Sequence, residues 1–351
     1  MERRADEGRS SGRIVFVGAV HEAEPALRAL LEMDADVSAV FTLSDRLAAR
    51  AAGAVDLEPL AKAFGVPLLR TDNLNAPTEV ERVRALSPDL IVAVGWTRLL
   101  GEELLRIPVR GCVGFHASLL PRHRGRAPVN WAILRGETIT GNTMMFLDPG
   151  ADTGDIIDQR QVSIEPDDTC ATVYAKVAAA GAQMLCMHLP ALLAGEAPRH
   201  PQDHDGADLL PKRTPEMGIT DWDRPARAVH DWIRALTHPY PGAFSYLNGR
   251  KLFLWRSAVP DGSKGHAGVA PGTLLGVAGQ ALRVATNDGT VHVLRVQEES
   301  GPEESGAAWY RRRTPAPGGR FRAVDATTAL WALGRGAANP SPVPFEKRGD
   351  T

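Results

Sequence analysis

One stretch of the sequence, residues 111–131, gathers side chains that can move protons and bind anions. His116 ends a short apolar run and is followed by Ser118, by Pro121 and by a basic loop that contains Arg122, His123, Arg124 and Arg126. Because histidine changes its charge near neutral pH, a histidine at the end of a strand is well placed for general acid or base catalysis. A structural histidine that bonds a backbone carbonyl fits this stretch equally well.

A second stretch, residues 146–158, combines carboxylates with glycines. Asp148, Asp152 and Asp155 lie close to Gly150 and Gly154, directly after the strand-like residues 142–147. Glycine allows the backbone to approach a ligand closely and to adopt positive φ. The spacing differs from that of the twelve-residue calcium loop, so we expect no metal here. A solvated turn is the alternative.

The elements around these two stretches predict an α/β fold with a mostly parallel sheet and helices on both faces. Strands alternating with helices are typical of βαβ units, and ligands then bind beyond the carboxyl ends of the strands. Both stretches follow a strand. The expected strands are residues 13–18, 37–42 and 90–94, and the expected helices are residues 22–33, 57–64, 79–86 and 169–193.

Composition changes along the chain and predicts several parts. Asn248-Gly249 and Asp288-Gly289 separate short apolar runs, as in β-hairpins, and indicate a small, mostly β, barrel-like second domain. The Gly-, Pro- and Arg-rich tail is expected to be partly disordered. The predicted parts are a polar leader (1–12), a catalytic domain (13–200), a linker (201–220), the second domain (221–300) and the tail (301–351).

The overall composition indicates a soluble, cytoplasmic protein. The chain has 351 residues, enough for two domains, and its formal charge of −2 argues against a chain built as a whole to bind nucleic acid. Its three cysteines (Cys112, Cys170 and Cys186) lack the paired spacing of a zinc site or a disulfide framework. The polar start lacks the apolar core of a signal peptide, and no apolar run approaches the length of a membrane span.

Together the two stretches resemble the formyltransferase family, whose donor is 10-formyltetrahydrofolate. That family includes methionyl-tRNA formyltransferase, sugar-amine N-formyltransferases and the hydrolase domain of formyltetrahydrofolate dehydrogenase. The resemblance implies a formyltransferase-type sheet domain followed by a small β-barrel, and it extends more weakly from residue 13 to about residue 300. The matching motifs are His116-x-Ser118-Leu-Leu-Pro121-x-x-Arg124-Gly125, Gly136-Glu137, Thr140-Gly141 and Asp152-Thr-Gly154-Asp155.

The resemblance implies a catalytic pair of His116 and Asp152, with Ser118 in the same motif. A neutral amine attacks the formyl carbon, and a donor such as His116 stabilises the developing oxyanion by roughly 3 kcal/mol. Asp152 favours the protonated histidine and accepts the amine proton, directly or through water. Gly114 stands where the family has an asparagine that helps to hold the formyl oxygen. The hydrolase domain also lacks this asparagine.

The resemblance also implies where the donor binds. The pterin ring is expected between the loop after residues 90–94 and the loop of residues 148–155. Trp96 fits a position in the core equally well. The expected donor-binding residues are Val94, Gly95, Trp96, Arg98, Leu99, Asp148, Gly150 and Asp155.

For the acceptor, the sequence favours a small-molecule amine, such as an amino sugar (nucleotide-linked ones included) or an amino acid derivative. Arg124, Arg126 and Asn130 are the expected substrate-binding residues, since guanidinium groups suit phosphate or carboxylate. Residues 43–53 are largely apolar and residues 221–234 carry mixed charges, and both features argue against an RNA acceptor. They do not exclude tRNA. The alternatives are a methionyl-tRNA formyltransferase, a formyltetrahydrofolate hydrolase suggested by Gly114, and a non-catalytic folate-binding module.

Overall fold

The computed structural model describes residues 12–262, 265, 268–313 and 318–335. All but the last residue of the expected leader, and residues 314–317 and 336–351 of the expected tail, lie outside the described residues. The chain divides into two compact units, which are described separately. The first contains residues 1–132 and 137–210, and the second contains residues 133–136 and 211–351.

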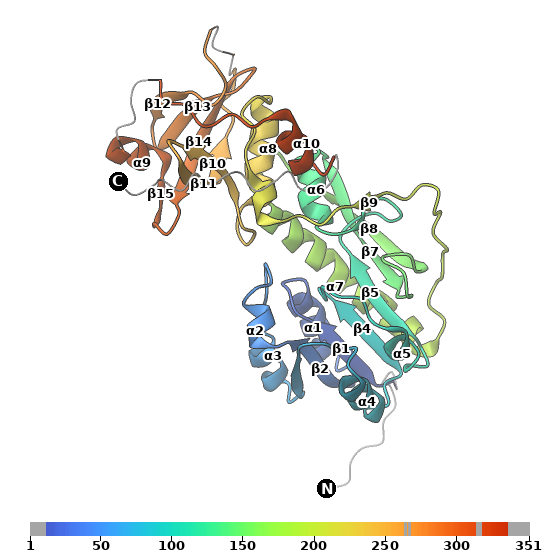
Figure 1. Ribbon diagram of the computed structural model, residues 1–351. Helices are drawn as coiled ribbons and strands as arrows, with labels where there is room; N and C mark the ends of the chain where they lie inside the picture. The colour runs from blue at the N-terminus through green and yellow to red at the C-terminus, as the bar shows by residue number, and fades with distance from the viewer. Residues whose placement is uncertain (1–11, 263–264, 266–267, 314–317, 336–351) are drawn as a thin grey trace. The chain divides into compact units, whose positions relative to one another are not determined.

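The first unit is built on a seven-stranded sheet with the strand order β3-β2-β1-β4-β5-β7-β8 (Figure 1). The first five strands in this order run parallel, and β7 and β8 are antiparallel. The predicted fold class is therefore confirmed. The strands are β1 (Ile14–Gly18), β2 (Val37–Leu43), β3 (Leu68–Thr71), β4 (Leu90–Val94), β5 (Cys112–His116), β7 (Ile139–Phe146) and β8 (Ile156–Ser163).

Helices cover both faces of this sheet because its central strands are apolar on both sides. Ile14 and Phe16 of β1 belong to one core cluster, and the intervening Val15 and Val17 belong to the other. The first cluster includes residues of α1 and α7, and the second includes residues of α4 and α5. The helices are α1 (Ala23–Glu32), α2 (Asp45–Ala48), α3 (Glu58–Ala63), α4 (Pro77–Ala85), α5 (Glu102–Leu105), α6 (Pro128–Leu134) and α7 (Cys170–Ala194).

Helix α7 corrects the expectation that no apolar run approaches the length of a membrane span. By length and composition alone it could cross a membrane, with a mean hydropathy of 1.5. It packs against α1, β7 and β8, and buries residues such as Val173, Val177 and Leu185. This is the environment of a core helix in a folded domain.

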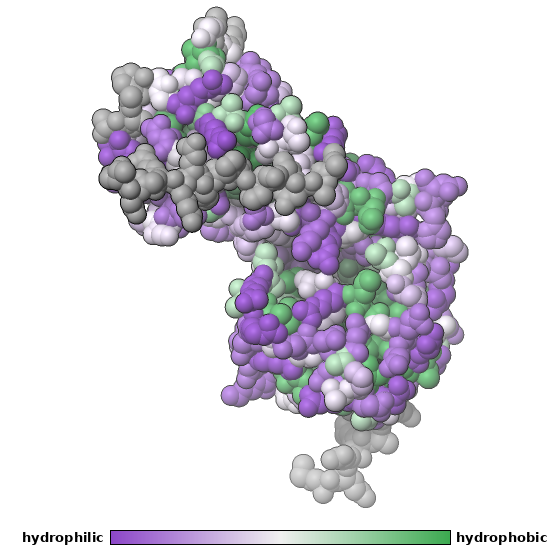
Figure 2. Space-filling view, in the orientation of Figure 1, coloured by the Kyte–Doolittle hydropathy of each residue, from purple (hydrophilic) through white to green (hydrophobic). Residues whose placement is uncertain are grey.

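The visible face of the molecule carries mainly hydrophilic residues with apolar ones scattered among them (Figure 2).

The strand registers bring the carboxyl ends of β1, β4 and β5 to one edge of the sheet. Gly18 pairs with Val94, and Ala93 pairs with Gly114. His116 is the last residue of β5, and Asp152 lies in the loop between β7 and β8. The sequence expectation that both chemical stretches follow strands is therefore met in the structure.

The second unit contains an antiparallel sheet with the strand order β10-β11-β14-β13-β12, and β15 pairs with β14. Residues 303–313 and 326–332, within the expected tail, form a strand and two helices, so this part of the tail is folded. The elements are α8 (Ala226–Leu236), β10 (Ala243–Leu247), β11 (Arg250–Ala258), β12 (Leu274–Ala278), β13 (Ala281–Ala285), β14 (Thr290–Glu298), β15 (Glu303–Ser305), α9 (Gly306–Arg313) and α10 (Ala326–Ala332).

The segment expected to be a linker, residues 201–220, begins as part of the first unit. Its strand β9 (Leu209–Leu210) pairs in parallel with β6 (Arg124–Gly125), in the loop after His116. A 3-10 helix, Pro215–Gly218, follows in the second unit. The domain boundaries given by the sequence remain predictions.

Candidate active site

His116 and Asp152 face each other at the edge of the sheet in the first unit. His116 Nδ1 lies 3.5 Å from Asp152 Oδ1, and the histidine side chain is only 7% exposed. Its Nε2 lies 2.7 Å from the carbonyl oxygen of His123. Both ring nitrogens therefore face oxygen atoms, and an imidazolium donates a hydrogen bond toward each of them. The ring is oriented by its own loop and by the aspartate.

Asp152 is held on both sides of its carboxylate. Its second oxygen, Oδ2, accepts a hydrogen bond of 2.8 Å from the backbone N–H of Gly125. The backbone φ of Asp152, +58°, lies in the left-handed region, which few non-glycine residues adopt. Such strain persists where surrounding contacts enforce it, and it is often found at functional sites.

The loop that carries Asp152 needs its glycines. A Cβ at Gly154 would lie 1.8 Å from the carbonyl oxygen of Phe146, so no other residue fits without a backbone shift. Asp148 closes the loop from within, because its Oδ1 accepts hydrogen bonds from Gly150 N at 3.1 Å and from Thr153 Oγ1 at 2.7 Å. The Asp148 side chain thus shapes the loop.

A side chain at position 114, where the family has an asparagine, would require the side chain of Leu147 to shift. A Cβ there would lie 2.7 Å from Leu147 Cδ2, so the leucine occupies the place of the missing group. Two nearby asparagines are buried elsewhere. Asn130, on α6, is 1% exposed, and the Nδ2 group of Asn142 donates a hydrogen bond to the carbonyl of Val177 on α7.

Gln202 is a site residue that the sequence analysis missed. Its Nε2 group donates hydrogen bonds to the backbone carbonyls of Asp152 at 3.0 Å and of Gly154 at 2.7 Å. Its Oε1 accepts hydrogen bonds from Arg124 Nε at 3.1 Å and Nη2 at 2.6 Å. Gln202 therefore joins the loop after His116 to the loop that carries Asp152.

This arrangement corrects the expectation for Arg124. Its side chain is 8% exposed and its guanidinium is bonded inside the protein, so it supports the site and does not face a substrate. Asn130 is buried as well, whereas Arg126 is exposed. Ser118 is 1% exposed, and its hydroxyl donates to the carbonyl of Arg122 at 2.8 Å, which fixes the turn of the loop.

The two loops expected to hold the pterin adjoin the same core cluster. Trp96 from one loop and Leu147 beside the other both pack against the cluster that includes Val15 and Ile91. Val94 is buried at the end of β4, and Gly95 has a φ of +61°. Arg98 and Leu99 are exposed: Arg98 donates to the carbonyl of Asp72, and Leu99 is 59% exposed. Asp155 is half-buried and pairs with Arg199 at 3.5 Å.

Comparison with known protein families decides the class of this site. Residues 12–189 match the model of the formyl transferase family, and residues 212–314 match the model of the formyl transferase C-terminal domain. The chain belongs to the formyltransferase family. The enzyme is accordingly a folate-dependent formyltransferase, and 10-formyltetrahydrofolate is its donor.

Several curated relatives of this formyltransferase are named methionyl-tRNA formyltransferase. The one from Myxococcus xanthus is 38% identical over 311 residues, which cover 88% of this chain and 97% of the relative. The one from Geotalea uraniireducens is 38% identical over 291 residues, which cover 82% of this chain and 90% of the relative. Both domains therefore have counterparts in these relatives.

Solved structures share the fold at lower identity. HypX from Aquifex aeolicus in complex with tetrahydrofolic acid has a TM-score of 0.63 and 20% identity, covering 87% of this chain and 48% of that chain. An N-formyltransferase from Helicobacter canadensis, in complex with folinic acid and dTDP-3-aminofucose, has a TM-score of 0.61 and 16% identity, covering 82% and 99%.

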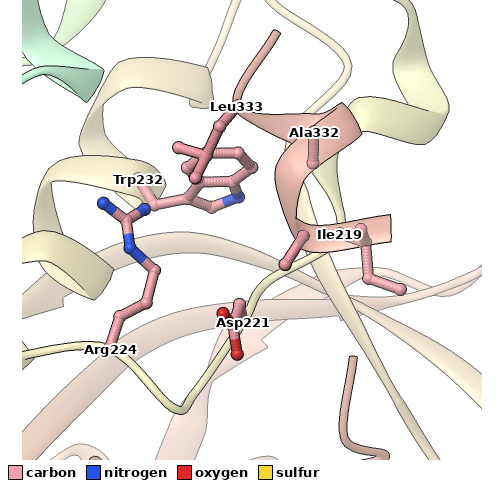
Figure 3. Close-up of a pocket in the computed structure, with 7 residues that line it drawn as sticks. Ile219, Asp221, Arg224, Trp232, Ala332 and Leu333 are labelled. Carbon is pink, nitrogen blue, oxygen red and sulfur yellow. The ribbon is translucent and has the colours of Figure 1, made fainter. Parts of the chain in front are cut away.

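The second unit contains a small cavity beside α10, and Figure 3 shows the side chains of Arg224 and Trp232 close together at it. The Arg224 guanidinium lies 5.7 Å from the centre of the Trp232 ring. At ≈ 10 Å³ the cavity has room for about one water molecule, too little for a folate or an acceptor. The lining residues are Ile219, Asp221, Arg224, Trp232, Ala329, Ala332 and Leu333.

Proposed function

We propose that this formyltransferase transfers the formyl group of 10-formyltetrahydrofolate to the α-amino group of methionyl-tRNA. The observation that carries this proposal is the match to methionyl-tRNA formyltransferases over both domains, at 38% identity and 97% of the relative's length. The sequence analysis favoured a small-molecule amine and kept methionyl-tRNA as an alternative. The curated relatives support methionyl-tRNA as acceptor better than a small-molecule amine.

The charge distribution also supports a nucleic-acid acceptor. Residues 211–351 contain 19 Lys and Arg against 13 Asp and Glu, whereas residues 12–210 contain 18 against 26. This C-terminal part of the chain, residues 211–351, is therefore basic, although the whole chain has a formal charge of −2. Phosphate neutralisation by basic residues supplies much of the affinity for RNA and DNA. The mixed charges of residues 221–234 do not represent all of this part of the chain.

The proposed mechanism needs no covalent intermediate on the protein. The neutral amine attacks the formyl carbon, the bond from that carbon to N10 of the folate breaks, and charge builds on the formyl oxygen in between. His116 donates a hydrogen bond to that oxygen. Since its Nε2 faces the carbonyl of His123, the formyl oxygen has to replace that carbonyl as the acceptor. Asp152, on Nδ1, orients the ring and accepts a proton from the attacking amine, and this proton then passes to N10 of the departing tetrahydrofolate.

A small-molecule amine remains the second candidate because of the segment between β2 and α3. This segment, residues 44–57, has two arginines, Arg46 and Arg50, and two aspartates, Asp45 and Asp56, and so has no net charge. Arg46 is paired with Asp72 at 3.0 Å. The segment therefore offers little attraction to tRNA phosphates, in contrast to residues 211–351.

The test measures tetrahydrofolate release from 10-formyltetrahydrofolate in the presence of methionyl-tRNA, uncharged tRNA, free methionine, a nucleotide-linked amino sugar, or no amine. We expect turnover with methionyl-tRNA. Turnover with the amino sugar alone would favour the second candidate, and formate release without any amine would favour a hydrolase. Donor binding without turnover under every condition would refute the transferase proposal.

A further inference from the structure

His123 is a buried histidine that the mechanism above uses only through its backbone carbonyl. Its side chain is 7% exposed, and its Nε2 lies 3.2 Å from Glu137 Oε1 and 4.0 Å from Asp208 Oδ2. Two carboxylates therefore face the same ring nitrogen, and at 3.2 Å a ring N–H donates a hydrogen bond to a carboxylate oxygen. Burying ionisable groups costs desolvation energy, so this arrangement calls for a role beyond filling space.

The backbone of His123 is held in a conformation that few side chains allow. Its φ of +60° lies in the left-handed region. Its backbone N–H donates to Asp208 Oδ1, and the next N–H, of Arg124, donates to the carbonyl of Asp208 at 3.0 Å. The contact between the imidazole and Glu137 holds the same residue from its side chain. A left-handed residue other than glycine persists where its surroundings enforce it.

In this conformation the carbonyl of His123 points at the ring of His116. The carbonyl oxygen lies 2.7 Å from His116 Nε2. Because a carbonyl only accepts hydrogen bonds, this contact requires a proton on Nε2. The other ring nitrogen, Nδ1, faces Asp152 at 3.5 Å. The loop thus selects the ring orientation, and the protonated Nε2, with which His116 can donate to a formyl oxygen.

We propose that the imidazole of His123 is a positioning group, which holds its own backbone carbonyl on His116 Nε2 and so prepares His116 for the formyl oxygen. His123 acts through His116, and the formyl oxygen takes the place of the carbonyl when the donor binds. Water would occupy an Nε2–H that the carbonyl had left, so losing the carbonyl frees no donor and removes only the orientation of the ring. The inference rests on the proposed role of His116 as donor to the formyl oxygen.

Alanine and glycine at position 123 separate this role from packing. Both remove the imidazole, but only glycine adopts a positive φ without strain. Other residues disfavour the left-handed conformation by about 10-fold, so in His123→Ala the carbonyl should turn away and kcat/KM for 10-formyltetrahydrofolate should fall by about that factor. His123→Gly should stay within about threefold of wild type. If the imidazole only filled space, glycine would be the more damaging substitution, because it leaves the larger cavity.

The test combines steady-state kinetics with NMR of isotope-labelled histidine side chains in the enzyme without donor. The Nε2–H signal of His116, identified by its loss in His116→Ala, should be visible in wild type and in His123→Gly, and lost to exchange with water in His123→Ala. Glu137→Ala should change the signal and kcat/KM in the same direction as His123→Ala. Binding of tetrahydrofolate, which has no formyl oxygen, should be unchanged. The fall in kcat should be smaller than the fall in kcat/KM, because saturating donor itself aligns the ring.

Asp34→Ala is the matched control. Asp34 also has a positive φ, +57°, and is exposed in the loop between α1 and β2, so its substitution should leave the His116 signal and kcat/KM unchanged. A His116 signal that persists in His123→Ala, or a His123→Gly enzyme weaker than His123→Ala, would overturn the role of His123 and leave the proposed function intact. If wild type formylates a small amine and not methionyl-tRNA, the proposed acceptor fails, and kinetics with that amine, beside the same NMR comparison, decide the role of His123. Full activity in His116→Ala would overturn both the mechanism and this inference.

Discussion

Replacing Gln202 with leucine tests whether the contacts of this residue hold the reacting groups in place. The substitution removes two donors, to the carbonyls of Asp152 and Gly154, and the acceptor of both Arg124 hydrogen bonds. A neutral hydrogen bond contributes about 1 kcal/mol, and a buried charge that loses its partner costs several times more. We therefore expect Gln202→Leu to lower the free energy of unfolding by about 3–5 kcal/mol.

The loss of activity should be larger than the loss that a smaller folded fraction alone would cause. Asp152 sits at a positive φ that its surroundings enforce, so without Gln202 its backbone can relax and move the carboxylate away from His116. A misplacement of about 1 Å can cost about 10²-fold in rate. We expect kcat to fall by about that factor, with a smaller change in KM for the folate. Gln202→Glu, which keeps an acceptor for Arg124 and loses the two donors, should lose activity more than stability.

Gln297→Leu is the control. Gln297 Nε2 donates to the carbonyl of Gly301 at 2.8 Å, and its Oε1 accepts from Trp255 Nε1 at 3.0 Å, so the same groups are lost in the second unit. Urea unfolding and steady-state kinetics under conditions where each variant is folded separate the two effects. A Gln202→Leu enzyme with the kcat of wild type, or with the same small change as Gln297→Leu, would refute the role given to Gln202.

Three further predictions concern the catalytic pair, the aspartate loop and acid stability. His116→Ala and Asp152→Asn should each lower kcat by about 10²–10³-fold while the protein still binds tetrahydrofolate; unchanged rates would remove both from the mechanism. Gly154→Ala places a Cβ 1.8 Å from a backbone carbonyl oxygen and should cost about 3 kcal/mol in urea unfolding; wild-type stability would contradict that geometry. The pKa of Glu298 is lowered from its usual 4.5 to about 2, chiefly by hydrogen bonds from an arginine on α9. A lowered folded-state pKa contributes stability that is present above pH 4.5 and is lost as the pH falls from 4.5 to 2. In Glu298→Gln the free energy of unfolding should therefore depend less on pH between 4.5 and 2.

The sequence predicted the first unit well because its signals are local. Apolar runs gave β4 with its observed bounds, and they gave α1 and α7 to within one residue at each end. The position of His116 also followed, since the carboxyl ends of parallel strands share an edge. Asp152 follows β7, which is antiparallel to β5, so its approach to His116 depends on the path of the loop after β7. The motifs of the family supplied the same pair.

Local signals of this kind do not predict contacts between residues that are far apart in the sequence. Gln202 lies 78 residues from Arg124 and 50 from Asp152, in a segment whose composition is typical of a linker. No periodicity or motif indicates that this segment pairs with the loop after His116 as a short strand. The burial of Arg124 was missed for the same reason, because an arginine in a basic loop has the same sequence signature whether it is exposed or buried.

Three consecutive residues after His116 determine how the reacting groups are held. His123 presents its carbonyl to His116, Arg124 reaches Asp152 through Gln202, and Gly125 donates its N–H to the Asp152 carboxylate. None of these contacts involves position 114. We therefore expect the loss of the family asparagine to leave the geometry of the histidine and aspartate intact. An asparagine restored at position 114 should add activity, and more of it when Leu147 is also replaced by alanine, because a Cβ at position 114 would lie 2.7 Å from Leu147 Cδ2 and displace that side chain.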